Sequence, residues 1–340
     1  MVERIDEATI AGLTRAGLLT DSGAVECVPL TGGVASDIWL VRGGSRPFVV
    51  KRALEKLRVA ADWHAPVARN ASEVAWLRRA AAIAPEAVPA VLAHDAELGF
   101  FAMSYLPPER YPVWKTALRD GRIDVQFAGA VGRAIATIHA STAMRREIAP
   151  EFNEDSVFRA LRIEPYLEYT AAHHPEVANA LYAMAAVVLG RHVALVHGDV
   201  SPKNILAGPD GPVFLDAECA WFGDPAFDLA FCLNHLLLKC LWRPAHGARY
   251  LASFEALAAA YLAKVDWEDA AAIEARVARL LPALLLARID GRSPVEYIVD
   301  ERPKALVRSF AVPLIKAPLP RLAAVREAWL AALGQDGIAA

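Results

Sequence analysis

An octapeptide past the middle of the chain, His-Gly-Asp-Val-Ser-Pro-Lys-Asn at residues 197–204, constrains the fold more than any other feature. A short apolar segment that ends in Asp216 follows it. Asp199 offers a carboxylate that can accept a proton from an attacking hydroxyl. The amide oxygen of Asn204 and the carboxylate of Asp216 are oxygen ligands of the kind that magnesium prefers. The octapeptide and Asp216 together therefore predict a phosphoryl-transfer site.

The spacing of these residues supports that prediction. Asp199 and Asn204 are five positions apart, as are the base and the metal ligand in kinase catalytic loops. Asp216 comes 17 residues after Asp199, beyond the turn sequence Gly-Pro-Asp-Gly at 208–211. A hairpin of that length would bring Asn204 and Asp216 side by side. A lone aspartate at a strand end is usually a turn residue, but this combination favours a metal ligand.

Four neighbouring residues are expected to support the site. Lys203 would neutralise charge on the transferred phosphoryl group, unless it is a solvent-facing lysine, and Ser201 would add a hydroxyl nearby. His197 is expected to orient the loop through hydrogen bonds rather than to do chemistry. Asp228 lies inside an apolar helical segment, and a buried carboxylate must be paired or hydrogen-bonded. We interpret Asp228 as a strut for the backbone of the catalytic loop.

The first hundred residues favour a small sheet with one long helix. A short helix is expected at 7–19, and a longer one near Asn70, where Asn70 and Glu73 resemble a capping box. Turn residues separate the expected strands, which alternate or are apolar throughout. These strands are Val25–Leu30, Asp37–Arg42, Pro47–Arg52, Ala90–Ala93 and Phe100–Tyr105. A five-stranded sheet is therefore plausible for residues 1–103.

Two features of this region suit nucleotide phosphates. Gly32 and Gly33 lie between two expected strands, where glycine lets backbone N–H groups approach a phosphate, and Ser36 would add a hydroxyl donor. A plain hairpin turn is the competing interpretation. Lys51 ends an apolar strand and would place a point charge on the α- and β-phosphates. Glu73 is the carboxylate expected to hold Lys51; a solvated lysine and a capping glutamate are the alternatives.

Beyond Pro107-Pro108 the pattern is mostly helical. Neither proline can continue a strand ladder, so the pair marks a connector. Helical periodicity predicts helices near 124–141, 155–172, 176–190, 226–240, 246–264, 267–289, 295–312 and 319–333. Two short strands, Ala194–Val196 and Val213–Asp216, interrupt them. The predicted organisation is an N-terminal lobe at 1–103, a hinge at 104–108 and a helical C-terminal lobe at 109–340.

The composition is that of an ordinary globular protein. Of the 340 residues, 55% are hydrophobic and 22% charged, and the formal net charge of −3 gives no electrostatic reason to expect nucleic acid as a partner. No apolar run reaches the roughly 18 residues needed to span a bilayer. The charged N-terminus has no signal-peptide core, and the four cysteines have no CxxC spacing. We therefore expect a cytoplasmic protein without a membrane partner; the oligomeric state is left open.

In combination these motifs resemble the aminoglycoside phosphotransferase and choline kinase-like family of small-molecule kinases. The shared pattern is His-Gly-Asp-x-x-x-x-Asn, then Leu-Asp-x-Glu, then Gly-Asp-Pro-x-x-Asp-Leu-Ala, and it runs from the glycine loop at residue 31 to at least Asp228. The resemblance implies an α+β, protein-kinase-like bilobal fold. The N-lobe would hold a five-stranded antiparallel sheet plus a helix, and the C-lobe would be mostly helical.

The resemblance also implies roles for individual residues. The residue matching Asp199 is the catalytic base in that family, and those matching Asn204 and Asp216 bind magnesium. The lysine matching Lys51 contacts ATP phosphates and pairs with the glutamate matching Glu73. Adenine would be received by the backbone of four residues, Met103, Ser104, Tyr105 and Leu106. The chain departs from the family in two places. Many members carry histidine where this chain has Ser201, and about 14 residues near 57–68 lengthen the link between Lys51 and its helix.

The acceptor is expected to be a small molecule. Asp228 follows Asp216 by only 12 positions, which leaves no room for the long activation segment and peptide platform of protein kinases. Candidate acceptor-binding residues recur at helical spacing after Asp228, namely Asn234, His235, Lys239 and Trp242. Arg292 lies in a polar interruption between two apolar helices, which also suits a charged interhelical turn.

Charge bears on the choice of acceptor. Basic residues slightly outnumber acidic ones between 226 and 310. A polycationic aminoglycoside would favour an acidic site, so a metabolite with an anionic or neutral polar group is preferred. The predicted function is an ATP- and Mg²⁺-dependent phosphotransferase that moves the γ-phosphoryl group to a hydroxyl of a small molecule. The alternatives are a nucleotide-binding regulator without turnover and an atypical protein kinase.

Overall fold

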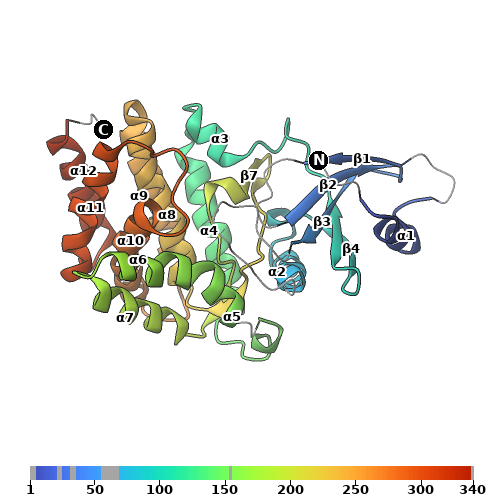
Figure 1. The fold of residues 1–340 in the computed structure, drawn as a ribbon, viewed down its shortest axis with the longest axis horizontal. Coiled ribbons are helices and arrows are strands. Elements are labelled where there is room, and N and C mark those ends of the chain that lie inside the picture. The colour runs from blue at the N-terminus through green and yellow to red at the C-terminus, as the bar shows by residue number, and fades with distance from the viewer. Residues whose placement is uncertain (1–4, 21–24, 31–35, 55–68, 153–154, 338–340) are drawn as a thin grey trace.

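The N-terminal part of the protein is built on one sheet, and the remainder is mainly helical (Figure 1). The computed structural model describes residues 5–20, 25–30, 36–54, 69–152 and 155–337. The five strands are antiparallel and lie in the order β1-β2-β3-β5-β4. Their bounds are β1 Glu26–Pro29, β2 Ser36–Arg42, β3 Phe48–Ala53, β4 Val91–Asp95 and β5 Phe100–Ser104. The predicted five-stranded sheet is confirmed.

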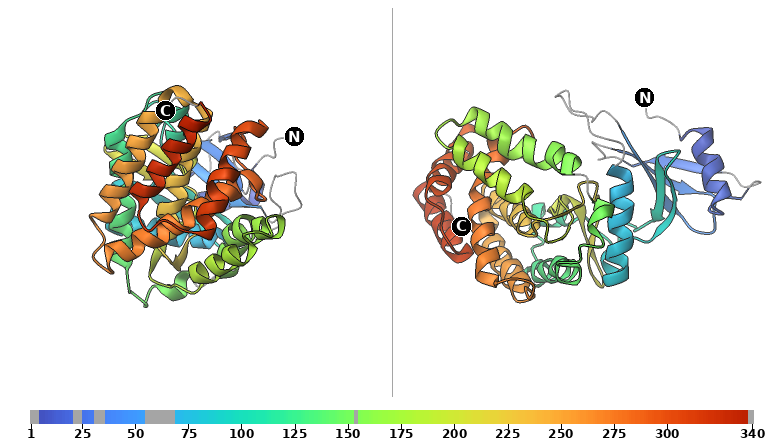
Figure 2. Two further views of the ribbon diagram at one scale, coloured as in Figure 1. Left: turned by 90° about the vertical axis from the view of Figure 1, so that its left-hand side faces the viewer. Right: turned by 90° about the horizontal axis from the view of Figure 1, so that it is seen from below.

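Each face of the sheet is covered by a helix. Successive apolar side chains of a strand point to opposite faces, so both faces have apolar surface to bury. Helix α1 (Glu7–Arg15) places Leu13 in a cluster with Val50 of β3 and Phe100 of β5. Helix α2 (Arg69–Ile83) lies on the opposite face, between the sheet and the C-terminal helices (Figure 2, right). Alternation turns Lys51, opposite Phe101 in the register, toward the α2 face.

The C-terminal part packs its helices around a single long core. The helices and short turns are α3 Trp114–Arg119, α4 Val125–Thr142, η2 Ala149–Phe152, α5 Asp155–Phe158, a π-helix Arg159–Glu168, α6 Tyr169–His173, α7 Ala178–Leu189, η4 Pro202–Asn204, α8 Ala226–Trp242, η5 Pro244–His246, α9 Gly247–Leu262, α10 Ala270–Asp290, α11 Glu301–Lys316 and α12 Leu322–Gln335. Helix α8 packs against α9 and α10 and is buried from Ala226 to Cys240. Within the described residues, no helix is both long and apolar enough to cross a membrane.

One expectation about local structure is wrong, and two predicted helices are present with differences in detail. Asn70 and Glu73 do not form a capping box, because α2 already begins at Arg69 and the Asn70 amide donates to the Gly99 carbonyl at 2.7 Å. The predicted helix at 155–172 contains a π-helix from Arg159 to Glu168, where Pro165 lacks the N–H that an α-helix would use. The helix predicted at 295–312 begins later, at Glu301.

Short strands in the C-terminal part are also more numerous than the two predicted. Within the described residues β6 (Ala194–Val196) pairs with β9 (Trp221–Gly223), and β7 (Ile205–Gly208) pairs with β8 (Gly211–Phe214). β9 is too short to give an alternating pattern, and only its partner strand defines it. The two pairs hold the ends of the octapeptide and of the segment that carries Asp216.

Candidate active site

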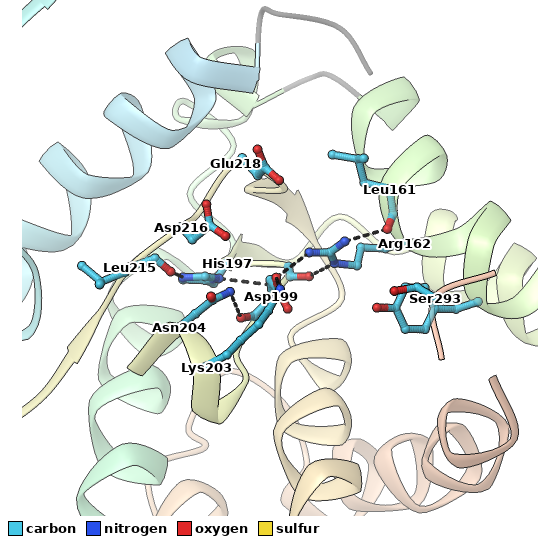
Figure 3. Close-up of polar contacts among 12 residues, drawn as sticks. Leu161, Arg162, His197, Asp199, Lys203, Asn204, Leu215, Asp216, Glu218 and Ser293 are labelled. Atoms are coloured by element: carbon cyan, nitrogen blue, oxygen red, sulfur yellow. Dashed lines mark hydrogen bonds and ion pairs between the residues drawn. The ribbon is translucent and has the colours of Figure 1, made fainter. Parts of the chain in front are cut away.

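The candidate catalytic loop, residues 197–204, leaves β6 through a turn that only glycine fits. Gly198 has φ of +79°, and a Cβ there would lie 2.4 Å from the carbonyl oxygen of Cys219. His197, just before it, accepts a hydrogen bond at Nδ1 from the backbone N–H of Asp199 at 3.1 Å. Its Nε2 donates to the Leu215 carbonyl at 3.1 Å (Figure 3). The His197 ring therefore joins the residue Asp199 to the residue just before Asp216.

The carboxylate of Asp228 binds the backbone of the loop. One oxygen of its carboxylate accepts the N–H of His197 at 2.7 Å, and the other accepts the N–H of Gly198 at 2.8 Å. His139 of α4 lies 3.2 Å from the same carboxylate through Nε2. Asp228 is fully buried, so its charge is stabilised by these donors rather than by water. The contacts expected of a strut are present.

Two basic side chains approach the carboxylate of Asp199 (Figure 3). Arg162, from the π-helix, lies 2.8 Å from Oδ2 and also donates to the Gly198 carbonyl at 2.5 Å. Lys203 lies 3.2 Å from the same oxygen, with its side chain 54% exposed. Burial acts to raise the pKa of Asp199, but Arg162 and then Lys203 outweigh it and hold the pKa below its usual range. Asp199 is therefore ionised at neutral pH.

The hairpin of β7 and β8 brings Asn204 close to the segment of Asp216, as predicted. The N–H of Leu215 donates to the Asn204 carbonyl at 2.9 Å, and the Asn204 amide nitrogen donates to the Asp199 carbonyl at 3.2 Å. Asp216 follows β8 with φ of +66°, a conformation rare outside glycine. The side chain of Asp216 is 34% exposed.

Lys51 joins the sheet to this hairpin. Its ammonium lies 2.6 Å from the Glu73 carboxylate and forms a second ion pair with Asp216. Lys51 and Glu73 are both buried. Burial would lower the pKa of Lys51, but Asp216 and then Glu73 raise it above the ordinary value. The predicted Lys51–Glu73 pair is present, and a solvated lysine is excluded for this position.

A second ion pair links the same two parts of the chain. Arg69, at the start of α2, donates from Nε to the Glu218 carboxylate at 3.0 Å, and both residues are buried. Glu218 follows Asp216 by two positions and belongs to the Leu-Asp-x-Glu motif. Burial and then the charge of Asp216 raise the pKa of Glu218, although Arg69 acts against them. Helix α2 is thus anchored to the segment that carries Asp216.

The oxygen donors near Asp216 fit a magnesium ion that is shared with phosphates. The Asn204 amide nitrogen is engaged with Asp199, and its Oδ1 accepts no hydrogen bond from a described residue. Lys51 and then Lys203 lower the pKa of Asp216 against the effect of burial, so its carboxylate is charged. Within the described ranges no three His, Cys, Asp or Glu residues form a cage for a metal. Mg²⁺ commonly completes such partial ligand sets with substrate phosphates and water.

Other predicted nucleotide-binding residues lie where the sheet approaches the helical part. Ser36 opens β2, and its Oγ is buried without a partner among the described residues. Met103 and Ser104 end β5, while Tyr105 and Leu106 lie beyond it and are half-buried. Gly32 and Gly33 lie outside the described residues. Ser201 is fully buried, and its Oγ also lacks a partner within the described residues.

The candidate acceptor residues divide into two groups. His235, Lys239 and Trp242 lie on α8 with Lys239 near the Trp242 ring, its ammonium 4.9 Å from the ring centroid. Asn234 is buried, and its amide nitrogen turns back to the Phe231 carbonyl. Arg292 pairs with Glu164 at 3.1 Å, and its N–H donates to the Pro165 carbonyl at 2.9 Å, as suits an interhelical turn.

Sequence reasoning missed Arg162, Arg69 and Arg288. Arg162 stands between apolar neighbours in Leu161 and Ile163, and a buried cation on an apolar helix face is the signal that could have found it. Arg69 pairs with a carboxylate 149 positions away, a separation that no local pattern reports. Arg288 lies within the apolar run of α10 and donates to the Tyr166 hydroxyl at 3.1 Å.

Comparison with known proteins places the chain in a family. The sequence model of the phosphotransferase enzyme family matches residues 26–259, which include the sheet, the catalytic loop and α8. The chain belongs to the phosphotransferase enzyme family. The resemblance inferred from the octapeptide and the motifs that follow it is thereby confirmed.

Curated relatives and solved structures agree with this placement. A methylthioribose kinase of Escherichia coli is 26% identical over 246 residues, which cover 62% of this chain and 57% of that protein. A methylthioribose kinase of Bacillus cereus is 25% identical over 257 residues, 67% of this chain and 64% of that protein. The chain thus spans about three fifths of the length of the curated relatives it matches.

A solved structure shows the fold. An amicoumacin kinase in complex with AMP-PNP and Ca²⁺ superposes with a TM-score of 0.53 at 14% identity, over 93% of this chain and 95% of that one. This likeness, together with the sheet and the helical remainder, shows the predicted protein-kinase-like fold.

Proposed function

We propose that the protein is an ATP- and Mg²⁺-dependent phosphotransferase that moves the γ-phosphoryl group to a hydroxyl of a small molecule. One observation carries the proposal: the ring of His197 holds the backbone of Asp199 on one side and that of Leu215 on the other, while Lys51 pairs with Asp216. A base, a metal carboxylate and a phosphate-binding cation thus meet where the sheet joins the helical part. Family membership and the relatives named as methylthioribose kinases support the same reaction type.

Each of these groups has a task in the proposed reaction. Asp199 orients the acceptor hydroxyl and takes its proton; because its pKa is low, the proton transfers late, as charge builds on the acceptor oxygen. Lys51 binds the α- and β-phosphates, held in place by Glu73. Lys203, exposed beside Asp199, contacts the transferred group. Asn204 and Asp216 would hold magnesium, which would neutralise phosphate charge.

The proposal extends to the organisation of the chain. Residues 1–103 would form the nucleotide-binding lobe, 104–108 the hinge that receives adenine, and 109–340 the lobe with the catalytic loop and acceptor helices. The end of β5 at Ser104 and the irregular segment after it support this division. In the amicoumacin kinase complex the bound groups are AMP-PNP and Ca²⁺, which agrees with a nucleotide and a divalent cation at such a site.

The structure favours a small acceptor over a polypeptide. Every residue from Ala217 to Ala230 is buried, so the interval after Asp216 presents no surface on which a peptide could dock. A regulator without turnover is disfavoured because Lys51, Glu73, Asp199, Asn204 and Asp216 are all retained. We therefore keep a metabolite as the preferred acceptor class.

Release of ADP from Mg-ATP across a panel of alcohols tests the proposal. Asp199→Asn should lower kcat by about 1,000-fold while Mg-nucleotide binding persists, since the base is removed and the phosphate contacts remain. Asp210→Asn, at the exposed turn of the same hairpin, is the matched control and should keep full activity. Nucleotide binding without turnover of any alcohol would favour the regulator, and labelled polypeptide would favour a protein kinase.

A further inference from the structure

One face of α8 leads away from the catalytic loop. Asp228, Phe231, His235, Lys239 and Trp242 follow one another at intervals of three or four residues, so they share a stripe along the helix. Asp228 holds the loop, and the Arg162 guanidinium lies 5.7 Å from the centre of the Phe231 ring. The rings of Phe231 and His235 are 5.5 Å apart. The stripe thus connects Asp199 and Arg162 to the outer half of the helix.

At that outer half, Lys239 is a buried cation without a carboxylate partner. Its residue is 1% exposed, and its ammonium lies 4.9 Å from the ring centres of both Trp242 and Tyr297. These two rings stack on each other at 4.3 Å. Among the described residues no Asp or Glu lies within ion-pair distance of Lys239. Ring contacts stabilise an ammonium, but they leave its hydrogen-bond donors unused.

Arg288, from α10, is a second cation without an ion pair to a described carboxylate. Its guanidinium lies 5.7 Å from the centre of the Tyr166 ring and donates to Ser293 Oγ at 3.1 Å. Its Nε is buried and has no hydrogen-bond partner in the described part of the chain. Lys115, from α3, adds a third charge 5.7 Å from the Tyr297 ring centre, although it pairs with Glu296.

These charges act on one another. Burial, followed by the charge of Lys115, lowers the pKa of Lys239 to about 7, although Glu296 acts in the opposite direction. Burial lowers the pKa of His235 well below its usual value, and Arg288, Lys239, Lys203 and Lys115 lower it further. His235 is therefore neutral, and it makes no hydrogen bond to a described residue. Like charges gathered in a buried place are unfavourable unless an anion joins them.

We propose that His235, Lys239 and Arg288 form an anion-binding subsite for the phosphoryl acceptor, so that the acceptor is an alcohol carrying a carboxylate or phosphate group. The inference rests on the proposed function and names the substrate class of the same site. Lys239 and Arg288 supply charged donors, His235 supplies a neutral N–H, and the Trp242 and Tyr297 rings line the subsite. A polycationic acceptor is disfavoured by the same charges.

The helix also sets the dimensions of the acceptor. Seven positions separate Asp228 from His235, a rise of roughly 10 Å along α8. The hydroxyl of the acceptor meets Asp199 near the start of the helix, and its anionic group meets the subsite about two turns further on at His235 and about three at Lys239.

Anion binding to the protein whose nucleotide site is already filled tests the subsite. The full chain is first saturated with Mg-AMP-PNP, and its nucleotide affinity is measured. Failure to bind the nucleotide would count against the proposed function and not against the subsite. Inorganic phosphate and acetate are then titrated by calorimetry as probes without a shape requirement. Two matched pairs follow, gluconate against glucitol and ribose 5-phosphate against ribose, which separate a carboxylate subsite from a phosphate subsite.

The expected result is saturable binding of at least one anion. Its neutral counterpart should bind at least about tenfold more weakly. Lys239→Met should weaken the anion about tenfold, Lys239→Arg should restore it in part, and Arg288→Gln provides a second variant if the first fails to fold. Lys264→Met, at an exposed position after α9, is the matched control and should bind the anion as the wild type does. AMP-PNP affinity should stay unchanged in all four.

Three results would overturn the inference while leaving the proposed function in place. One is that no anion binds the nucleotide-loaded protein at up to about 50 mM, a concentration that detects even a weak single-ion contact. Another is that glucitol and ribose bind as tightly as their charged counterparts. The third is that folded Lys239→Met or Arg288→Gln binds the anion with wild-type affinity.

Discussion

The guanidinium of Arg162 lies 2.8 Å from the carboxylate of Asp199, and both side chains are buried. The candidate base is therefore held by an arginine that also donates to the carbonyl of Gly198. Arg162 fixes the direction of the carboxylate while lowering its pKa. Removing the arginine should change both properties, and they can be measured separately.

Arg162→Met should destabilise the protein by about 3 kcal/mol, because it leaves the Asp199 carboxylate buried without its nearest cation. The folded-state pKa of Asp199 is lowered, so its contribution to stability is present above its unfolded pKa and is lost as the pH falls through the folded value. The deficit of the variant should therefore shrink in acid. Urea unfolding at pH 7 and at about pH 3, below the ordinary pKa of an aspartate, measures it. An equal deficit at both pH values would contradict the role given to Arg162.

Lys51→Met and Glu73→Gln should each lower kcat/KM for ATP by about 100-fold, and the double variant should lose little more. The reason is that Glu73 acts on phosphates only through Lys51, from which it lies 2.6 Å. A double-mutant cycle with Mg-ATP as the varied substrate measures the coupling. Losses that multiply would show instead that Glu73 contributes independently of Lys51.

Asp216→Asn should abolish the magnesium dependence of nucleotide binding, since the carboxylate is the charged member of the proposed ligand pair. Fluorescence titration of a labelled nucleotide with and without Mg²⁺ checks this. The variant should retain weak, metal-independent binding through Lys51. Unchanged stimulation by Mg²⁺ would remove Asp216 from the metal site.

Asp228→Asn should reduce kcat more than it changes KM for ATP. Asn offers one acceptor oxygen where the carboxylate accepts the N–H groups of both His197 and Gly198. One buried N–H is left unpaired, which costs about 1–3 kcal/mol and loosens the loop that carries Asp199. Steady-state kinetics and thermal unfolding together report the two effects. A variant with wild-type kcat and lower stability would make Asp228 a purely structural residue.

Affinity for an anionic acceptor should fall as the pH rises above 7. The pKa of Lys239 is lowered to about 7, first by burial and then by Lys115, so the free protein loses this positive charge near neutrality. Glu296, Cys232 and Arg288 also act on the pKa of Lys239, and the neutral His235 and the phenol ring of Tyr297 lie beside it. KM for the acceptor, measured from pH 6 to pH 9, should rise in the wild type and stay nearly level in Lys239→Met.

The sequence predicts the candidate site better than its surroundings. The five-stranded sheet, the hairpin that joins Asn204 to the Asp216 segment and the Lys51–Glu73 pair follow from local patterns and motif spacing. These features are readable because strand alternation, glycine turns and fixed spacing act within a few residues. The capping-box interpretation of Asn70 and Glu73 failed because a buried partner on another strand or loop took each side chain.

The parts that the sequence could not predict depend on long-range pairing. Arg162 and Arg288 look like ordinary basic residues in helical runs, and only the packing of the π-helix and α10 shows what they contact. Arg69 meets Glu218 across 149 positions. The local sequence of β9 is not strand-like enough to indicate the pairing with β6. In each case the deciding partner lies on a distant element.

The buried run from Ala217 to Ala230 has a consequence for control of the protein. In many protein kinases the corresponding interval is a surface segment that a modifying enzyme can reach, so that catalytic output is switched after synthesis. Here that interval belongs to the core and is anchored by Arg69 at Glu218 and by β6 at β9. The segment that follows Asp216 is thus in place as soon as the chain folds, and we expect no modifying enzyme to reach it in the folded protein.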